Sequence, residues 1–107
     1  MNKQPLSELI PAVAMGAAHQ TKKLGWRIVV ISGGWVIVGL VEDMTTHLTV
    51  HNSQCIRVWG TVRGLGQLVS GPLPGTTLDP IGMVQVPSHA VLFLIEVSQE
   101  IWAGVPM

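Results

Sequence analysis

The sequence has few charged residues. Only 11% of its 107 residues are Asp, Glu, Lys or Arg, whereas 48% are hydrophobic. The formal net charge is zero, which argues against a nucleic-acid-binding protein, because such proteins normally carry a basic patch. So little charge also means that part of the surface is apolar, and self-association would cover it. We therefore expect a homo-oligomer.

The sequence also lacks a second cysteine and a long apolar run. Cys55 is the single cysteine, which excludes an intrachain disulfide and leaves the reactivity of its thiol open. The apolar stretch 28–41 is shorter than the roughly 20 residues of a spanning helix. Pro87 interrupts the stretch 81–97, and Glu8 interrupts the N-terminal run that resembles a signal peptide. We expect a soluble, cytoplasmic chain without membrane contact.

The length of 107 residues indicates a single domain, covering 1–107. Residues 1–25 are rich in alanine and end with two lysines and a glycine, a helix stop signal, so we expect an N-terminal helical segment with helix within 7–23. Pro11 either starts this helix or kinks it. Residues 26–101 form the predicted β-rich core.

Short apolar runs within that core predict strands. Residues 27–31 and 35–41 are two buried strands joined by a glycine-rich turn, and 83–86 and 91–97 are two more. The fold class we predict is mainly β (α+β). We expect a small curled antiparallel sheet or barrel of about five or six strands, with an N-terminal helix and one short helix.

The stretch 48–60 predicts a central β-hairpin. Apolar and polar residues alternate on both sides of Asn52–Gln54, which is typical of strands with one buried face. A three-residue loop at Asn52–Gln54 pairs Val50 with Ile56 and keeps the aliphatic side chains on one face. The other face then holds the polar and aromatic side chains of the hairpin: His47, His51, Thr49, Arg57 and Trp59.

The segment after the hairpin predicts one short helix and a loop. Within 61–70, leucine and valine recur at helical spacing, and Gly71 ends the pattern. Two further glycines inside this segment weaken the helix by about 1 kcal/mol each relative to alanine. Residues 72–80 carry three prolines and are predicted as loop.

The sequence contains no motif typical of catalysis, metal binding or a phosphate loop. His47 and His51 would lie about 13 Å apart in a strand, at ~3.3 Å per residue, which is too far to share one zinc ion. Cys55 as a nucleophile would need His51 as its base, and no acidic residue is evident in the sequence to orient that histidine. We therefore expect no enzyme, no metal and no cofactor.

Arg57 and Trp59 are the centre of a candidate ligand site. A guanidinium beside an indole can bind a planar anion by charge-assisted hydrogen bonds and stacking. The alternative is that Trp59 belongs to the core and Arg57 pairs with Glu42 or Asp43. The full set of candidate ligand-binding residues is Arg57, Trp59, Arg63, Trp35, His47, His51 and Thr49.

The order of these features resembles a family of small phage and prophage β-rich proteins, over residues 27–101. In this chain Val58 stands where a second aromatic residue is common in the family. The resemblance implies a phage-encoded binding module without a known activity. The matching pieces are the turn Ser32-Gly33-Gly34, the strand end Arg57-Val58-Trp59-Gly60, the helix residues Leu65, Leu68 and Gly71, and the final strand 91–97.

Two classes of function follow. In the first, the protein is a non-enzymatic phage counter-defence module, which captures a small nucleotide-like signal or blocks a host defence protein. In the second, it is a structural or assembly protein, either a virion component or an accessory protein, working through apolar oligomer interfaces. A pocket lined by arginine and tryptophan would favour the first class, and broad apolar interfaces without such a pocket would favour the second.

Overall fold

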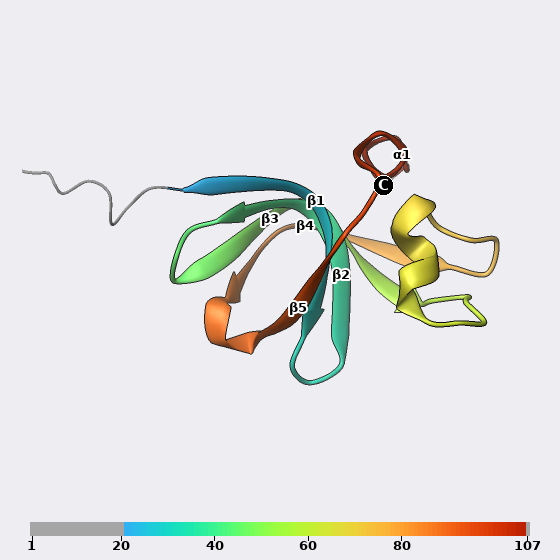
Figure 1. Cartoon of the computed structure of the whole chain (residues 1–107), viewed down its shortest axis with the longest axis horizontal. Helices are drawn as coiled ribbons and strands as arrows, with labels where there is room; N and C mark the ends of the chain where they lie inside the picture. Colours follow the sequence, from blue (N-terminus) through green and yellow to red (C-terminus); the bar gives the residue numbers. More distant parts are fainter. Residues whose placement is uncertain (1–20, 107) are drawn as a thin grey trace, which may run out of the picture.

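The computed structural model describes residues 21–106. These residues form five antiparallel strands in one open sheet, with few and short helical segments (Figure 1). The expected mainly β fold is therefore confirmed. The predicted N-terminal helix lies outside the described residues, apart from its expected last residues, Lys22 and Lys23, which belong to the first strand instead.

The chain runs as a meander whose last strand returns to the first. The strand order in the sheet is β4-β3-β2-β1-β5, and all four neighbouring pairs are antiparallel. The elements are β1 (Lys22–Ile31), β2 (Trp35–Asp43), β3 (His47–Val58), the 3-10 helix η2 (Leu65–Ser70), β4 (Thr77–Pro87), the 3-10 helix η3 (Ser88–Ala90), β5 (Val91–Glu96) and α1 (Gln99–Ala103).

The sheet is strongly curled because its two edge strands are consecutive in the chain. β4 and β5 lie at opposite edges, yet only the three residues of η3 connect them (orange in Figure 1). Two backbone hydrogen bonds hold η3 in place: Ser88 N donates to Thr46 O at 3.1 Å, and Ser32 N donates to Ala90 O at 2.8 Å. The β1–β2 turn and the β2–β3 turn therefore both lie next to η3.

Both faces of the sheet are buried, each over part of its area. Ile28 and Val29 are adjacent in β1, point to opposite faces and are both fully buried. Burial on both faces explains the uninterrupted apolar runs of β1 and β2. We call the two groups of buried residues the helix-side cluster (Ile28, Val36, Val38, Ile56, Leu68, Val97 and Trp102) and the inner cluster (Val29, Ile37, Val41, Leu48, Val50 and Val86).

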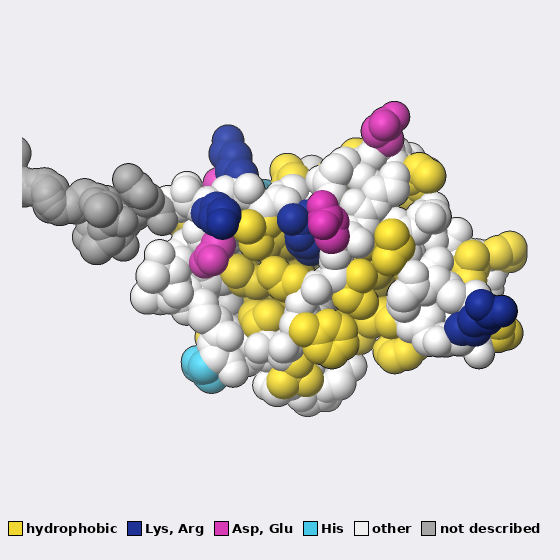
Figure 2. Space-filling model, in the orientation of Figure 1, with side chains coloured by type: hydrophobic (Ala, Val, Ile, Leu, Met, Phe, Trp, Pro, Cys, Tyr) yellow, Lys and Arg dark blue, Asp and Glu magenta, His cyan; other side chains and the backbone are white. Residues whose placement is uncertain are grey.

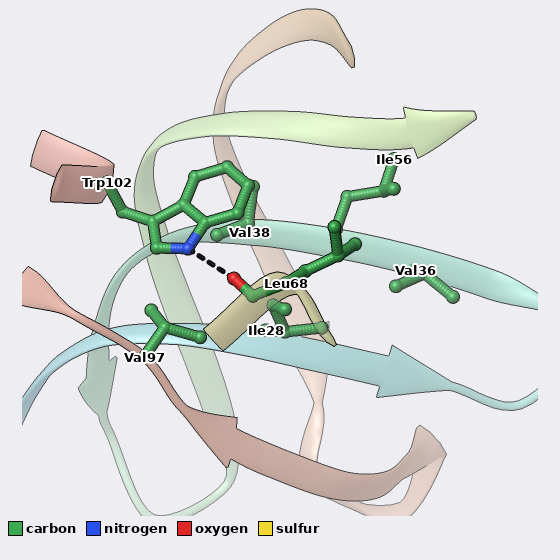
Figure 3. Close-up of a cluster of buried hydrophobic side chains, with 7 residues drawn as sticks. All are labelled: Ile28, Val36, Val38, Ile56, Leu68, Val97 and Trp102. Carbon is green, nitrogen blue, oxygen red and sulfur yellow. Dashed lines mark hydrogen bonds between the residues drawn. The ribbon is translucent and has the colours of Figure 1, made fainter. Parts of the chain in front are cut away.

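Trp102 fixes the C-terminal helix to the helix-side cluster (Figure 3). Its side chain is fully buried, and its indole Nε1 donates a hydrogen bond to Leu68 O of η2 at 2.8 Å. Ser98 supports the same contact, because its backbone N–H donates to Val69 O at 2.8 Å. The C-terminal segment therefore covers one face of the sheet together with η2.

The predicted hairpin at 48–60 is wrong. β3 runs without a turn from His47 to Val58 and lies between β2 and β4, so Val50 pairs with Val41 and Val84 rather than with Ile56. Asn52 has a positive φ of 51°, and the pairing register shifts next to it, which makes this segment a bulge. Ser53 and Gln54, which follow Asn52, are buried rather than exposed in a turn. Ser53 Oγ donates a hydrogen bond to Gly82 O of β4.

Two smaller expectations also change. The predicted helix within 61–70 is the 3-10 helix Leu65–Ser70, which begins later and has only six residues. The predicted loop 72–80 is strand from Thr77 onward. Pro80 does not prevent this, because β4 is an edge strand, where a missing backbone N–H is tolerated.

Trp102→Ala is expected to lower the free energy of unfolding by about 3–5 kcal/mol, because it removes a buried indole and leaves a cavity. The matched control is Trp35→Ala, whose side chain is 63% exposed and whose loss is expected to cost within about 0.5 kcal/mol. Urea unfolding of both variants measures the difference. Equal losses in the two variants would contradict the anchoring role of Trp102.

Candidate functional site

The candidate residues of β3 lie on opposite sides of the sheet. Thr49 stands between two residues of the inner cluster, so its own side chain points to the other face. Asp79 pairs with Cys55 in the sheet, and Cys55 packs against the inner cluster. Arg57 contacts Asp79, so its side chain lies on the side of the inner cluster. The predicted surface that carries both Thr49 and Arg57 is therefore wrong. The bulge at Asn52 is the cause, since one extra residue reverses the alternation of side chains along the strand.

Arg57 forms an ion pair with Asp79 of β4. Its Nε lies 2.6 Å from Asp79 Oδ2, and its second nitrogen donates to Oδ1 at 3.4 Å. The hydrogen bond and the charge of Arg57 lower the pKa of Asp79, and the same contact raises the pKa of Arg57. The expectation that Arg57 pairs with an acidic residue is correct in kind, but the partner is Asp79 of β4 rather than Glu42 or Asp43 at the end of β2. This guanidinium is already engaged.

The two tryptophans of the candidate site are both exposed. Trp59 follows β3 and is 41% exposed, so its alternative assignment to the core is wrong. Trp35 begins β2, and its side follows from Ile37, which pairs with Cys55 and belongs to the inner cluster. Trp35 is thus on the side of Arg57, near the point where the pairing of β2 with β3 ends. The structure therefore brings Trp35 and Arg57 to one side of the sheet.

Arg63 lies in the segment between β3 and η2. Its side chain is exposed, and its backbone N–H donates to Gln67 Oε1 at 2.8 Å. The carbonyl of Trp59 accepts a hydrogen bond from Thr76 Oγ1 at 2.7 Å, which ties the start of this segment to the residue before β4. These contacts fix the backbone around both candidates.

His51 and His47 lie on the other half of β3. His51 Nε2 is 2.7 Å from Glu42 Oε1, so an acidic residue does orient this histidine. The sequence did not reveal this pair because Glu42 belongs to the neighbouring strand. His47 Nδ1 lies 3.1 Å from Thr46 Oγ1. Cys55 packs against the inner cluster, on the side away from His51, so the two do not form a nucleophile–base pair.

Two hollows on the described part of the protein are lined by neither arginine nor tryptophan. One, of about 410 Å³, is lined by Lys23, Leu40, Val41, Glu42, His51 and Asn52. The other, of about 350 Å³, is lined by Asp43, Thr45, Leu48, Ser88, Val91 and Leu94. Among residues 21–106, no group of three or more His, Cys, Asp or Glu side chains could hold a metal ion. No helix in the same range is long and apolar enough to cross a membrane.

The edge strand β5 carries a feature that the sequence analysis missed. Leu92 and Phe93 are large apolar side chains and are 62% and 53% exposed. Figure 2 shows hydrophobic side chains gathered on this face over β5 and β1. The apolar run was visible in the sequence, but its position at a sheet edge depends on pairing with β1, which is far away in the chain.

Comparison of the chain with protein-family models, with curated proteins and with solved structures found no match. The resemblance to small phage and prophage proteins therefore stays a prediction. The function has to be argued from the geometry.

The contribution of the Arg57–Asp79 pair to stability is expected to depend on pH. The folded-state pKa of Asp79 is lowered, so this stabilisation is present above the usual aspartate pKa of about 3.9 and is lost as the pH falls through the lower folded-state value. Asp79→Asn should therefore be slightly less stable than wild type at pH 7, and this difference should be smaller near pH 2. The difference is expected to be small, because both side chains are solvent-exposed.

Urea unfolding at both pH values, with and without high salt, measures this difference. A loss in Asp79→Asn that is the same at both pH values would show that Asp79 acts through packing rather than through its charge.

Proposed function

We propose that the protein is a non-enzymatic assembly module, which associates with further copies of itself through the open apolar edge of its sheet. This is the structural or accessory class of function, of the phage type that the sequence resemblance implies. The observation that carries the proposal is the exposed β5 edge with Leu92 and Phe93.

An edge strand is a template for another strand. Among the described residues β5 pairs with β1 alone, so about half of its backbone N–H and C=O groups point away from the sheet. Exposed apolar side chains beside such groups mark an interaction surface. The exposed large hydrophobic residues of the described chain are Trp35, Leu40, Val58, Trp59, Val62, Ile81, Met83, Leu92, Phe93 and Ile101.

The hypothesis of nucleotide capture has less support from the geometry of one subunit. Arg57 is engaged by Asp79, and Thr49 and His51 lie on the other side of the sheet. A planar anion would have to compete with the carboxylate of Asp79 for this guanidinium. Capture in a pocket between subunits would itself require assembly first.

Native mass of the full chain, measured over a wide range of protein concentration, tests the proposal. We expect a defined oligomer that dissociates on dilution, because an edge contact forms by mass action. A monomer at every concentration would contradict self-assembly.

A thermal-shift panel of cyclic and ADP-ribose-type nucleotides separates the two classes. The assembly module is expected to show no stabilisation, whereas a captured ligand at 100 times its dissociation constant would stabilise by about 2.7 kcal/mol. Stabilisation that disappears in Arg57→Ala would favour nucleotide capture instead.

A further inference from the structure

We infer that the partner on the β5 edge is a second copy of this chain, paired antiparallel about a two-fold axis at Phe93. The pairing joins two five-stranded sheets into one continuous sheet. The inference rests on the proposed function, because it gives the arrangement of the copies at the same edge.

The edge strand β4 carries features that block pairing. Pro80 and Pro87 lack a backbone N–H, Asp79 carries a charge, and Gly82 has a positive φ of 78° within the strand. Proteins use such residues to prevent strand pairing at exposed edges. The register between β4 and β3 is also irregular. This edge is therefore protected.

The edge strand β5 has no such protection over most of its length. Residues 91–95 contain no proline, no glycine and no charged side chain, and Glu96 is the first charge. A bulge at Leu92 is the one irregularity, and the pairing with β1 is regular from Phe93 to Glu96. An apolar edge of this kind pairs with another strand. The contrast with β4 identifies β5 as the edge that is covered in solution.

A second copy of β5 is a self-complementary partner. With Phe93 opposite Phe93 of the partner subunit, Leu92 lies opposite Leu94 of the partner subunit on each side of the axis. The bulge at Leu92 turns Val91 towards the inner cluster, whereas Ile95 packs against the helix-side cluster, so these two residues do not form a pair. Every such pair is apolar, so no like charges face each other. Opposite residues of antiparallel strands project to the same face, so the two phenylalanines meet directly. A two-fold axis requires this identity of the two surfaces.

The same pairing also limits the size of the assembly. After two β5 strands have paired, both outer edges of the joined sheet are β4 strands, which carry Pro80 and Pro87. These protected edges do not continue the sheet. A closed dimer follows, whereas pairing of β5 with β4 of the next copy would repeat head to tail into a ring or a filament. The chain has no net charge, so long-range electrostatics do not favour a strongly charged partner over a second copy of the chain.

Native mass of Phe93→Lys tests the interface. Two lysines at the two-fold axis would repel each other and remove the aromatic contact, so we expect this variant to be monomeric at concentrations where wild type has twice the monomer mass. The matched control is Met83→Lys on the β4 edge, which replaces a side chain of similar exposure, 64% against 53%. The control is expected to remain dimeric. Far-UV circular dichroism of each variant verifies that the sheet is folded.

A charge-swap experiment tests the register. Phe93→Lys and Phe93→Glu are each expected to be monomeric, and an equimolar mixture is expected to recover the dimer mass, because position 93 faces itself only in this alignment. A variant that unfolds is replaced by Leu92→Lys and Leu92→Glu, which should each be monomeric by the same measurement.

The outcomes separate the inference from the proposed function. A wild-type oligomer that survives Phe93→Lys but dissociates in Met83→Lys would overturn the β5 interface and keep self-assembly. A mass above that of a dimer would indicate the head-to-tail arrangement and also overturn the two-fold pairing. A wild type that is monomeric throughout would overturn the self-assembly on which both rest.

Discussion

The short connection between the two edge strands determines the shape of this protein. β4 and β5 are at opposite edges of the sheet, but only the three residues of η3 join them. A flat sheet of this strand order could not be connected in so few residues, because neighbouring strands are about 4.8 Å apart. The sheet therefore curls, and Val86 near one edge and Leu94 on the other pack around the same inner cluster. Curling also frees the second face for η2 and α1, which Trp102 holds in place.

The bulge at Asn52 has the next largest effect. It places Val50 in the inner cluster and Ile56 in the helix-side cluster, although the two residues would share a face in a regular strand. The same shift separates Thr49 from Arg57. One inserted residue thus allows a single long strand to contribute to two cores on opposite faces, and it divides the polar side chains of that strand between two unrelated surfaces.

The low charge of the chain matters most at the two edges of the sheet. The two edges differ in kind: β4 contains prolines, a glycine with positive φ and an aspartate that pairs with Arg57, whereas β5 is a short apolar strand with exposed Leu92 and Phe93. Exposed apolar side chains in a chain with so few charges favour association over free solution. This asymmetry between the two edges is the observation on which the proposed assembly depends.

The sequence by itself determined the class of the fold, because the apolar runs of β1, β2 and β5 reflect local propensity and burial. It could not separate a turn at Asn52–Gln54 from a bulge, because Asn, Ser and Gln fit both and only the flanking strands β2 and β4 decide between them. The pairs Arg57–Asp79 and His51–Glu42 likewise depend on neighbouring strands. Tertiary structure alone decided which strands became edges, because strand order arises from long-range pairing, which no local pattern encodes.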